Sequence, residues 1–252
     1  KLVVPLAVAW YLADRILPPR LIFVAVSLAL VGLPALLILQ QPDLGTALLI
    51  AASGLFVLFL AGIGWSYIVG AVGLAAASAW PAWQFVLKDY QKQRILTMLD
   101  PESDKLGAGW NIIQSKTAIG SGGWDGKGWL KGTQSQLDFL PESHTDFIIA
   151  VLAEEHGLRG VLMLMGLYLL ILLRGFWIGL RAQTSFGRMM AGSLTLTFFV
   201  YIFVNMGMVA GLLPVVGVPL PLVSAGGTSV VTLMAGFGIL MAVSTEKPMV
   251  AR

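Results

Sequence analysis

The chain contains no cysteine and only two histidines among its 252 residues. The absence of cysteine excludes disulfides, thiolate catalysis and cysteine-based zinc sites, and two histidines argue against a histidine-rich metal site. Charged residues make up 12% of the chain, whereas soluble domains carry about a quarter. The net charge of +3 is too small, and its basic residues too scattered, for a nucleic-acid-binding protein. What remains is apolar, with a mean hydropathy of +0.84, as in membrane proteins.

Long uncharged stretches predict an all-α fold, a polytopic bundle of transmembrane helices. Six full spans are expected, at 21–39, 46–62, 67–86, 159–180, 189–211 and 230–245. The first apolar run, 2–13, is shorter than the roughly 20 residues that a span requires. Because the chain also starts without Met, we expect a partial first span and an N-terminal truncation. We further expect one membrane domain over 1–252, with the polar segment 88–145 as a large loop outside the membrane.

The basic residues in and beside the short connections predict the orientation. They are Arg15, Arg20, Arg174, Arg181, Arg188, Lys247 and Arg252. Alternating spans place all of them on one side, which the positive-inside rule identifies as cytoplasmic. The turn at 40–45, the region 88–158 and the Pro/Gly segment 212–229 then lie on the outer face. Because the motif-like sequences gather on this face, we expect a functional site there.

The segment Leu140–Phe147 holds two acids, a histidine and two hydroxyls directly before an apolar helix. Two interpretations are open. Ser143 or Thr145 can cap the helix while Asp146 complements its dipole. Alternatively, Asp146 is a general base, because desolvation at an apolar boundary raises the pKa of a carboxylate and makes it a better proton acceptor.

Three other segments carry candidate residues, each with a structural alternative. Asp43, between two apolar spans, suits the start of a helix or a cavity at the membrane boundary. The glycine-rich stretch 120–129 is typical of a mobile surface loop, or of an anion-binding loop to which Lys127 and Lys131 add charge. Glu154 and Glu155 interrupt an apolar run, either in the outer headgroup layer or as functional groups.

Three long strings resemble one family of bacterial membrane proteins. They are QPDLGT at 41–46, GWNIIQSKTAIGSGGWDGKGWLKGTQSQLDFLPESHTDF at 109–147 and NMGMVAGLLPVVGVPLPLVSAGGTS at 205–229. They are similar to the shape, elongation, division and sporulation family, which includes RodA, FtsW and SpoVE. The wording at 114–123 and 132–142 is closer to the elongation, or RodA, type. One departure is Ala225, where the family usually has Tyr.

The resemblance implies a ten-span peptidoglycan glycosyltransferase in the bacterial cytoplasmic (inner) membrane, with its active site on the extracytoplasmic face. Such an enzyme polymerises lipid II into β-1,4 glycan strands by an inverting displacement that releases undecaprenyl pyrophosphate, for cell elongation and rod shape. The implied partner is a class B penicillin-binding protein that supplies transpeptidation. A divalent cation, Mg²⁺ or Mn²⁺, is a further candidate, although no cofactor is certain from the sequence.

The resemblance also implies roles for individual residues. Asp146 matches the key acid of the family and is the expected catalytic base. Asp43 and Lys116 match further family elements and are expected to bind substrate. The charges of Arg94, Lys127 and Lys131, apart from the resemblance, make them candidates to bind the pyrophosphate, and Glu142 and Glu155 complete the expected substrate-binding residues. A flippase or transporter of lipid-linked cell-wall precursors is the main alternative, because transporters also use intramembrane acids and broken helices. A module that only docks a partner is the other alternative.

Overall fold

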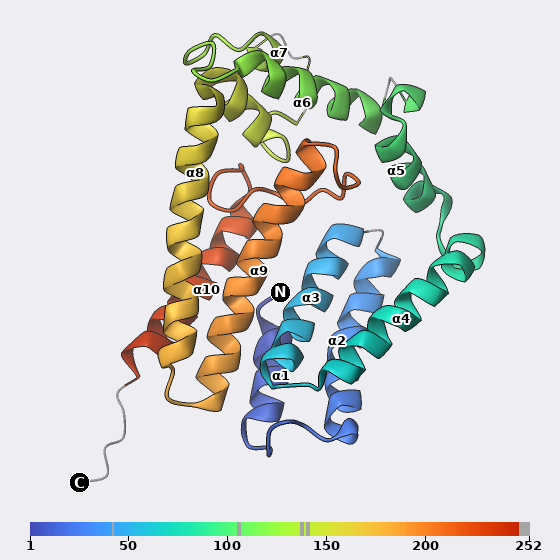
Figure 1. The fold of residues 1–252 in the computed structure, drawn as a ribbon, viewed down its shortest axis with the longest axis vertical. Coiled ribbons are helices and arrows are strands. Elements are labelled where there is room, and N and C mark those ends of the chain that lie inside the picture. The colour runs from blue at the N-terminus through green and yellow to red at the C-terminus, as the bar shows by residue number, and fades with distance from the viewer. Residues whose placement is uncertain (42, 105–106, 137–138, 140–141, 247–252) are drawn as a thin grey trace. The chain divides into compact units, whose positions relative to one another are not determined.

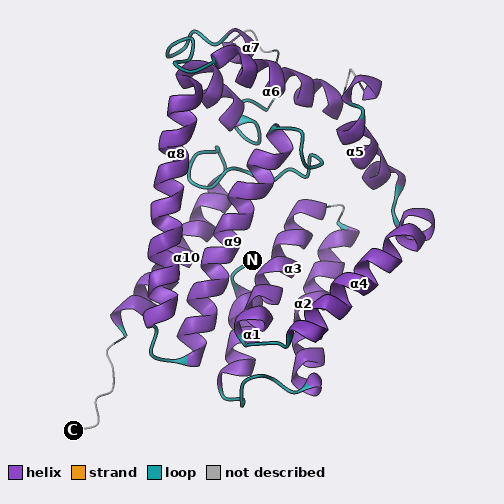
Figure 2. Cartoon of the chain, viewed as in Figure 1, coloured by secondary structure: helices purple, strands orange, loops and turns teal. Residues whose placement is uncertain are grey.

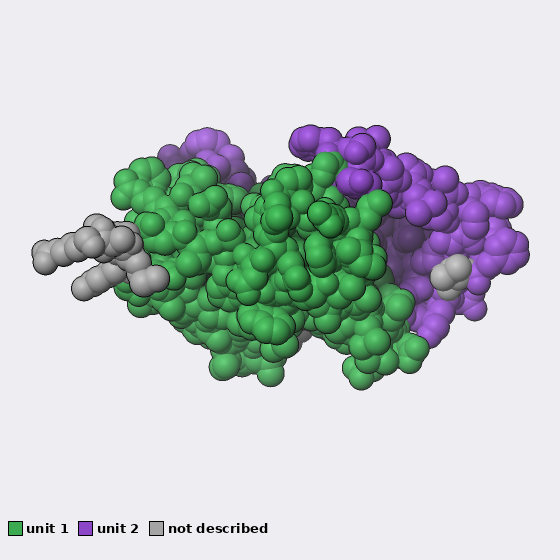
Figure 3. Space-filling model, turned by 90° about the horizontal axis from the view of Figure 1, so that it is seen from below, with its two compact units in different colours: residues 1–64, 168–201, 227–252 green, residues 65–167, 202–226 purple. Residues whose placement is uncertain are grey.

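The structure is a computed structural model that describes residues 1–41, 43–104, 107–136, 139 and 142–246. Within these ranges all regular secondary structure is helical (Figure 2). The helices are α1 (Val3–Ala13), α2 (Leu21–Gln40), α3 (Leu44–Leu60), α4 (Trp65–Pro81), η1 (Ala82–Val86), α5 (Asp89–Leu99), η2 (Pro101–Asp104), α6 (Ala108–Gly122), α7 (Thr133–Gln136), α8 (Ile148–Arg181), α9 (Ser185–Val209) and α10 (Gly227–Thr245). The chain divides into two compact units, which Figure 3 colours separately.

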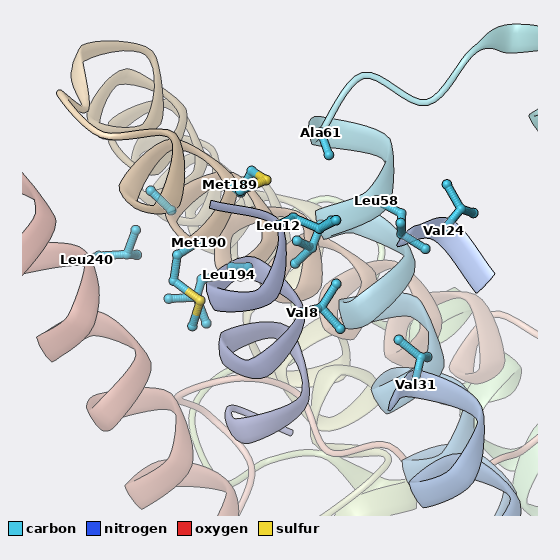
Figure 4. Close-up of a cluster of buried hydrophobic side chains, with 13 residues drawn as sticks. Val8, Leu12, Val24, Val31, Leu58, Ala61, Met189, Met190, Leu194 and Leu240 are labelled. Carbon is cyan, nitrogen blue, oxygen red and sulfur yellow. The ribbon is translucent and has the colours of Figure 1, made fainter. Parts of the chain in front are cut away.

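The first unit comprises residues 1–64, 168–201 and 227–252. Its core gathers apolar side chains from α1, α2, α3, α9 and α10, including Val8, Leu12 and Met190, each with none of its surface exposed (Figure 4). Helices α2 and α3 approach closely because Gly54 presents no side chain to Val31, as small residues allow in membrane bundles. The buried hydroxyl of Ser193 on α9 donates to the carbonyl of Ser53 on α3 at 2.7 Å.

The connections of the first unit that carry basic residues lie at one end of it. Figure 1 places the α1–α2 loop, the α8–α9 turn and the end of α10 together at the bottom. The hydroxyl of Thr184 in the α8–α9 turn lies 3.4 Å from the carboxylate of Glu246 after α10. This arrangement matches the clustering that the positive-inside argument requires. Of the seven basic residues used in that argument, Lys247 and Arg252 lie outside the described residues.

The predicted spans correspond to helices. Within the part of the chain that the structure describes, five helices are long and apolar enough to cross a membrane: Leu21–Gln40, Trp65–Phe85, Ile148–Arg181, Ser185–Val209 and Gly227–Thr245. The sixth predicted span is α3, whose 17 residues stand at the lower end of the range that crosses a bilayer. The short α1 corresponds to the expected partial span. The protein is therefore a multi-pass helical membrane protein.

The second unit comprises residues 65–167 and 202–226. The segment 88–145, expected as a loop, is helical over much of its described length, in α5, η2, α6 and α7. Helix α6 packs against η2 through Gly109, where a Cβ would lie 2.2 Å from the carbonyl oxygen of Pro101. The hydroxyl of Ser115 on α6 donates to the carbonyl of Val209 at 2.9 Å, so α6 is attached to the end of α9.

Helix α8 is broken near its start. Gly157 has φ 64° and ψ −165°, which no helical residue adopts, so a first half at 148–156 is separated from the long membrane-spanning half. Such a backbone conformation is essentially restricted to glycine. The sequence showed an interruption of the apolar run at 154–157 but did not predict a break in the helix, and the predicted span after it is confirmed as a helix.

Candidate active site

Three consecutive backbone carbonyls, of residues 144–146, are fixed by one distant segment of the second unit. They accept hydrogen bonds, in order, from the backbone N–H of Ala225 (2.9 Å), the hydroxyl of Ser224 (2.6 Å) and the side-chain amide of Asn205 (2.8 Å). The turn that carries Asp146 is thus held at each residue just before α8 begins. The family usually has a tyrosine at the position of Ala225. The hydrogen bond from residue 225 to the carbonyl of His144 uses only the backbone N–H, so it does not require the tyrosine side chain.

The two side chains that fix the turn also bind the segment from which they come. The amide of Asn205 donates a second hydrogen bond, to the carbonyl of Val218 at 2.8 Å, and the hydroxyl of Ser224 accepts one from the N–H of Leu220 at 2.7 Å. Asn205 is fully buried and Ser224 is 6% exposed. Since buried polar groups require partners, these bonds join the Pro/Gly segment and the turn into one structure.

The carboxylate of Asp146 lies half-buried at this junction. Burial raises the pKa of Asp146 above its ordinary value of 3.8, and the negative charge of Glu142 raises it further. Gly217 faces the carboxylate, since a Cβ there would lie 3.6 Å from Oδ2. A carboxylate with a raised pKa is a stronger base than an ordinary aspartate. The arrangement therefore suits proton abstraction from a hydroxyl.

The hydrogen bonds within the same turn bear on the capping interpretation. The hydroxyl of Thr145 donates to Oε2 of Glu142 at 3.1 Å, so this hydrogen bond lies within the turn. The backbone N–H groups of Thr145 and Phe147 both donate to the carbonyl of Glu142, at 3.1 and 3.2 Å. Glu142 is exposed, so its carboxylate remains accessible beside Asp146.

Lys116 lies against the same Pro/Gly segment as Asp146. A Cβ on Gly211 would lie 2.6 Å from Nζ of Lys116, so the ammonium group rests directly on the backbone at Gly211, whose φ is +70°. Gly211 and Gly217 are six residues apart and touch Lys116 and Asp146 respectively. Six residues of extended chain reach at most about 20 Å, so one short segment connects the two candidates.

The glycine-rich stretch differs from the expected mobile loop. The N–H groups of Lys127 and Gly128 donate to the carbonyls of Glu154 and Glu155, both at 2.9 Å. In the other direction, the N–H groups that begin the second half of α8 donate to the stretch, from Leu158 to Gly123 (2.9 Å) and from Arg159 to Trp124 (3.3 Å). A break in a helix leaves carbonyl and N–H groups on either side of it without intrahelical hydrogen-bond partners. Residues 123–128 provide partners for four of these groups.

Lys127 is engaged within this assembly. Its ammonium group lies 2.7 Å from Oε1 of Glu154, whose side chain is fully buried. Glu155, another expected substrate ligand, is 6% exposed, so it offers little surface to a substrate. Lys131 is exposed and lies just after the hydrogen-bonded stretch 123–128. Whether any of these side chains binds substrate stays a prediction.

The remaining candidates lie on other helices. Arg94, on α5, places its guanidinium carbon 6.0 Å from the ring centre of Tyr90. Asp43 belongs to the first unit, where its Oδ1 accepts a hydrogen bond from the N–H of Thr46 at 2.9 Å and caps α3. The structural alternative for Asp43 is thus realised, and a substrate role stays a prediction. Across the described ranges, no three acidic or histidine side chains are grouped as a metal site requires.

Sequence reasoning found Asp146 but missed the side chains that hold it. Asn205 is the only carboxamide residue between 189 and 245. Polar residues inside membrane segments are commonly functional, so its isolation among apolar residues was a usable signal. Ser224 gives no such signal, because serine is common in membrane helices and turns.

Comparison with known proteins identifies the family of the chain. A model of the FtsW/RodA/SpoVE family, described as cell cycle protein, matches residues 1–249. Peptidoglycan glycosyltransferase MrdB of Escherichia coli K12 is 60% identical over 252 residues, which is 100% of this chain and 68% of that protein. The probable peptidoglycan glycosyltransferase FtsW of Alkalilimnicola ehrlichii is 42% identical over 233 residues, which is 90% of this chain and 57% of that protein.

Solved structures show the same relationship. One similar chain comes from a structure of a peptidoglycan synthase complex, which is described as showing the structural coordination of polymerization and crosslinking. It aligns with a TM-score of 0.80 at 32% identity, covering 96% of this chain and 67% of that one. The rod shape determining protein RodA of Thermus thermophilus aligns with a TM-score of 0.65 at 28% identity, covering 97% of this chain and 63% of that one. The chain therefore belongs to the FtsW/RodA/SpoVE family.

Proposed function

We propose that the protein is a peptidoglycan glycosyltransferase that polymerises lipid II into β-1,4 glycan strands for cell elongation. The observation that carries this proposal is the carboxylate of Asp146, half-buried, with a raised pKa, on a turn whose three carbonyls are fixed by residues 205–225. A relative with 60% identity over the whole chain bears the name of this activity.

Asp146 acts as the general base. The C4 hydroxyl of the acceptor N-acetylglucosamine loses its proton to the carboxylate as its oxygen attacks the anomeric carbon of the donor N-acetylmuramic acid. The bond from that carbon to the pyrophosphate oxygen breaks, and undecaprenyl pyrophosphate leaves with the bonding electron pair. One displacement inverts the anomeric centre, so an α-linked donor gives a β-1,4 link. A placed base contributes about 10²–10⁴-fold to such a reaction.

The leaving group requires positive charge rather than a proton, because pyrophosphate is already a weak base. Lys116 is the foremost candidate, since its ammonium rests on the segment that also faces Asp146. Arg94 and Lys131 are further candidates, with partly or fully exposed side chains. Glu142 contributes through its charge on Asp146. Asp43 and Glu155 belong to the substrate-binding set proposed from the sequence.

The described residues contain no group of three histidine, aspartate or glutamate side chains that could bind a divalent cation. Mg²⁺ is commonly bound through one or two carboxylates together with substrate phosphates. Any Mg²⁺ or Mn²⁺ in this reaction would accordingly arrive with the pyrophosphate. The steps above do not depend on the ion.

The proposed location is the bacterial cytoplasmic membrane, with the Asp146 turn on the extracytoplasmic face. The basic connections at one end of the first unit support this orientation, because such residues favour the cytoplasm. The proposed partner is a class B penicillin-binding protein. One structural neighbour is a peptidoglycan synthase complex that couples polymerization to crosslinking, which supports a crosslinking partner here.

Polymerisation by the purified full-length protein tests the proposal. The protein, reconstituted without an ion gradient or nucleotide, is given lipid II, and glycan strands are separated by electrophoresis. Strand formation by the wild type supports the enzyme. Transfer of labelled lipid II across vesicle membranes without strand formation would instead support the flippase. A protein that does neither, yet binds a transpeptidase, would be a docking module.

A further inference from the structure

The glycine-rich stretch 123–128 is hydrogen-bonded to the end of the first half of α8, and Asp146 lies just before the start of this half-helix. This half-helix, 148–156, starts two residues after Asp146 and ends at the break. A helix of nine residues is unstable alone, so its position depends on what holds its two ends. Residues 205–225 hold the turn at its beginning, and the stretch 123–128 holds its end.

Close backbone contact at the far end is possible because three glycines meet there. A Cβ on Gly122 would lie 1.9 Å from the carbonyl oxygen of Ala153, and one on Gly126 would lie 2.2 Å from that of Glu155. A Cβ on Gly157 would lie 2.4 Å from the N atom of Gly126. Contacts this short exclude any side chain, so the two backbones can hydrogen-bond only with glycine at these positions.

The carboxylate of Glu154 is the polar centre of this contact. Its Oε1 accepts hydrogen bonds from the ammonium of Lys127 (2.7 Å), the backbone N–H of Gln134 (3.0 Å) and the hydroxyl of Thr133 (3.2 Å). Glu154 lies in the last turn of the half-helix, where the helix dipole disfavours negative charge. Its side chain is 0% exposed, whereas that of Lys127 is 27% exposed. Lys127 therefore supplies a positive charge at 2.7 Å from this buried carboxylate, beside the two neutral donors.

We infer that Lys127 is a positioning residue: by pairing with Glu154 it fixes the half-helix 148–156 and thereby the carboxylate of Asp146, and it does not bind the pyrophosphate. The inference rests on the proposed function, since it concerns the placement of the proposed base. It replaces the substrate-binding role that the sequence suggested for Lys127. A base displaced by about 1 Å can cost roughly a hundredfold in rate, so the pair influences turnover without touching substrate.

The test compares Lys127→Met, Glu154→Gln and the double variant in full-length protein with lipid II. Lys127→Met removes the positive charge beside a buried carboxylate, and we expect kcat to fall roughly tenfold to a hundredfold with little change in KM. Glu154→Gln should be milder, because the freed ammonium can turn to solvent. The double variant should recover to the level of Glu154→Gln, since a neutral pair of similar shape replaces a buried ion pair without stranding a charge.

The exposed ion pair between Arg159 and Asp125, both side chains 67% exposed, provides the matched control. Arg159→Met removes an ion pair from the same contact, but an exposed one, whose contribution is small, and it should leave kcat and KM unchanged. Hydrogen exchange supplies a readout without catalysis: the amides of 148–156 should exchange faster in Lys127→Met than in wild type and recover in the double variant.

Three results would overturn the inference. A double variant as impaired as Lys127→Met would mean that the ammonium acts directly on substrate. A raised KM with normal kcat in Lys127→Met would mean the same. Unchanged turnover in Lys127→Met would mean that the pair has no effect on the base. Failure of the wild type to polymerise lipid II would instead contradict the proposed function, and the exchange measurement would still test the contact itself.

Discussion

The side-chain amide of Asn205 joins two carbonyls 72 residues apart in the sequence, those of Asp146 and Val218, each at 2.8 Å. Through these bonds α9 holds the turn before α8 against the Pro/Gly segment. The proposed base therefore takes its position from a fully buried residue of a membrane-spanning helix.

Replacement of Asn205 by Leu should lower both stability and turnover. The substitution leaves the buried carbonyl of Val218 and the part-buried carbonyl of Asp146 without this donor, and a buried group left unsatisfied costs about 1–3 kcal/mol. We expect a lower melting temperature in detergent and a reduced kcat. Ser193→Ala is the matched control, because it removes another buried hydrogen bond of α9, to the carbonyl of Ser53, away from the turn. If both variants lost turnover in proportion to stability, Asn205 would have no specific effect on the base.

Asp146→Asn should abolish most polymerisation and leave the fold intact. The amide is close in shape to the carboxylate but cannot accept the proton, so we expect a loss of about 10²–10⁴-fold in lipid II polymerisation. The melting temperature should not decrease, because burial already disfavours the charged form. Asp125→Asn, at an exposed acid of the same unit, should remain active. Polymerisation near the wild-type rate by purified Asp146→Asn would remove this residue from the role of base.

The pH dependence of turnover should reflect the surroundings of Asp146. Its pKa is raised by burial and by Glu142, so activity should be lost, as the pH falls, at a higher pH than an ordinary aspartate would give. Glu142→Gln removes a negative charge and lowers the pKa of Asp146. The acid limb of the kcat/KM profile should then move to lower pH.

Glu102→Gln, at an exposed acid of η2, is the control for a general change in surface charge. Its acid limb should coincide with that of the wild type. An acid limb that did not move in Glu142→Gln, or that moved to higher pH, would contradict the electrostatic coupling of the two carboxylates.

Local sequence patterns predicted the spans and singled out the turn that carries Asp146, because both have local causes. An uncharged run of about 20 residues is explained by the bilayer alone, and an acidic turn before an apolar helix is visible within eight residues. The interruption of the hydrophobic pattern at Glu154 and Glu155 was also visible, but the break in the helix backbone at Gly157 was not predicted.

The contacts that hold the site have no such local cause. The hydroxyl of Ser224 reaches the carbonyl of Thr145, and Lys127 reaches Glu154, only after distant segments have folded together. The glycine stretch at 120–129 was interpreted as a mobile surface loop or an anion-binding loop, because glycine removes local constraints and lets backbone N–H groups approach an anion. The same lack of side chains instead permits the backbone contact at the helix break, and composition alone does not distinguish these outcomes.

Gly157→Ala should destabilise the second unit. The residue has φ 64° and ψ −165°, a conformation that costs an ordinary residue about 1–3 kcal/mol, and the new Cβ would collide with the N atom of Gly126. We expect a lower melting temperature in detergent. Gly166→Ala, in the regular part of the same helix with open space around it, should be neutral or slightly stabilising. Equal melting temperatures for the two variants would be inconsistent with the strained break.

Substitutions of Asp43 can separate its cap from its charge. Asp43→Asn keeps an oxygen that accepts from the N–H of Thr46 but removes the negative charge, whereas Asp43→Ala removes both. Loss of the cap should cost about 1 kcal/mol, so only Asp43→Ala should lower the melting temperature. If Asp43 also binds substrate, as we propose, Asp43→Asn should raise the KM for lipid II at an unchanged melting temperature. Wild-type kinetics in Asp43→Asn would restrict this residue to capping α3, because the cap is the only property that the variant retains.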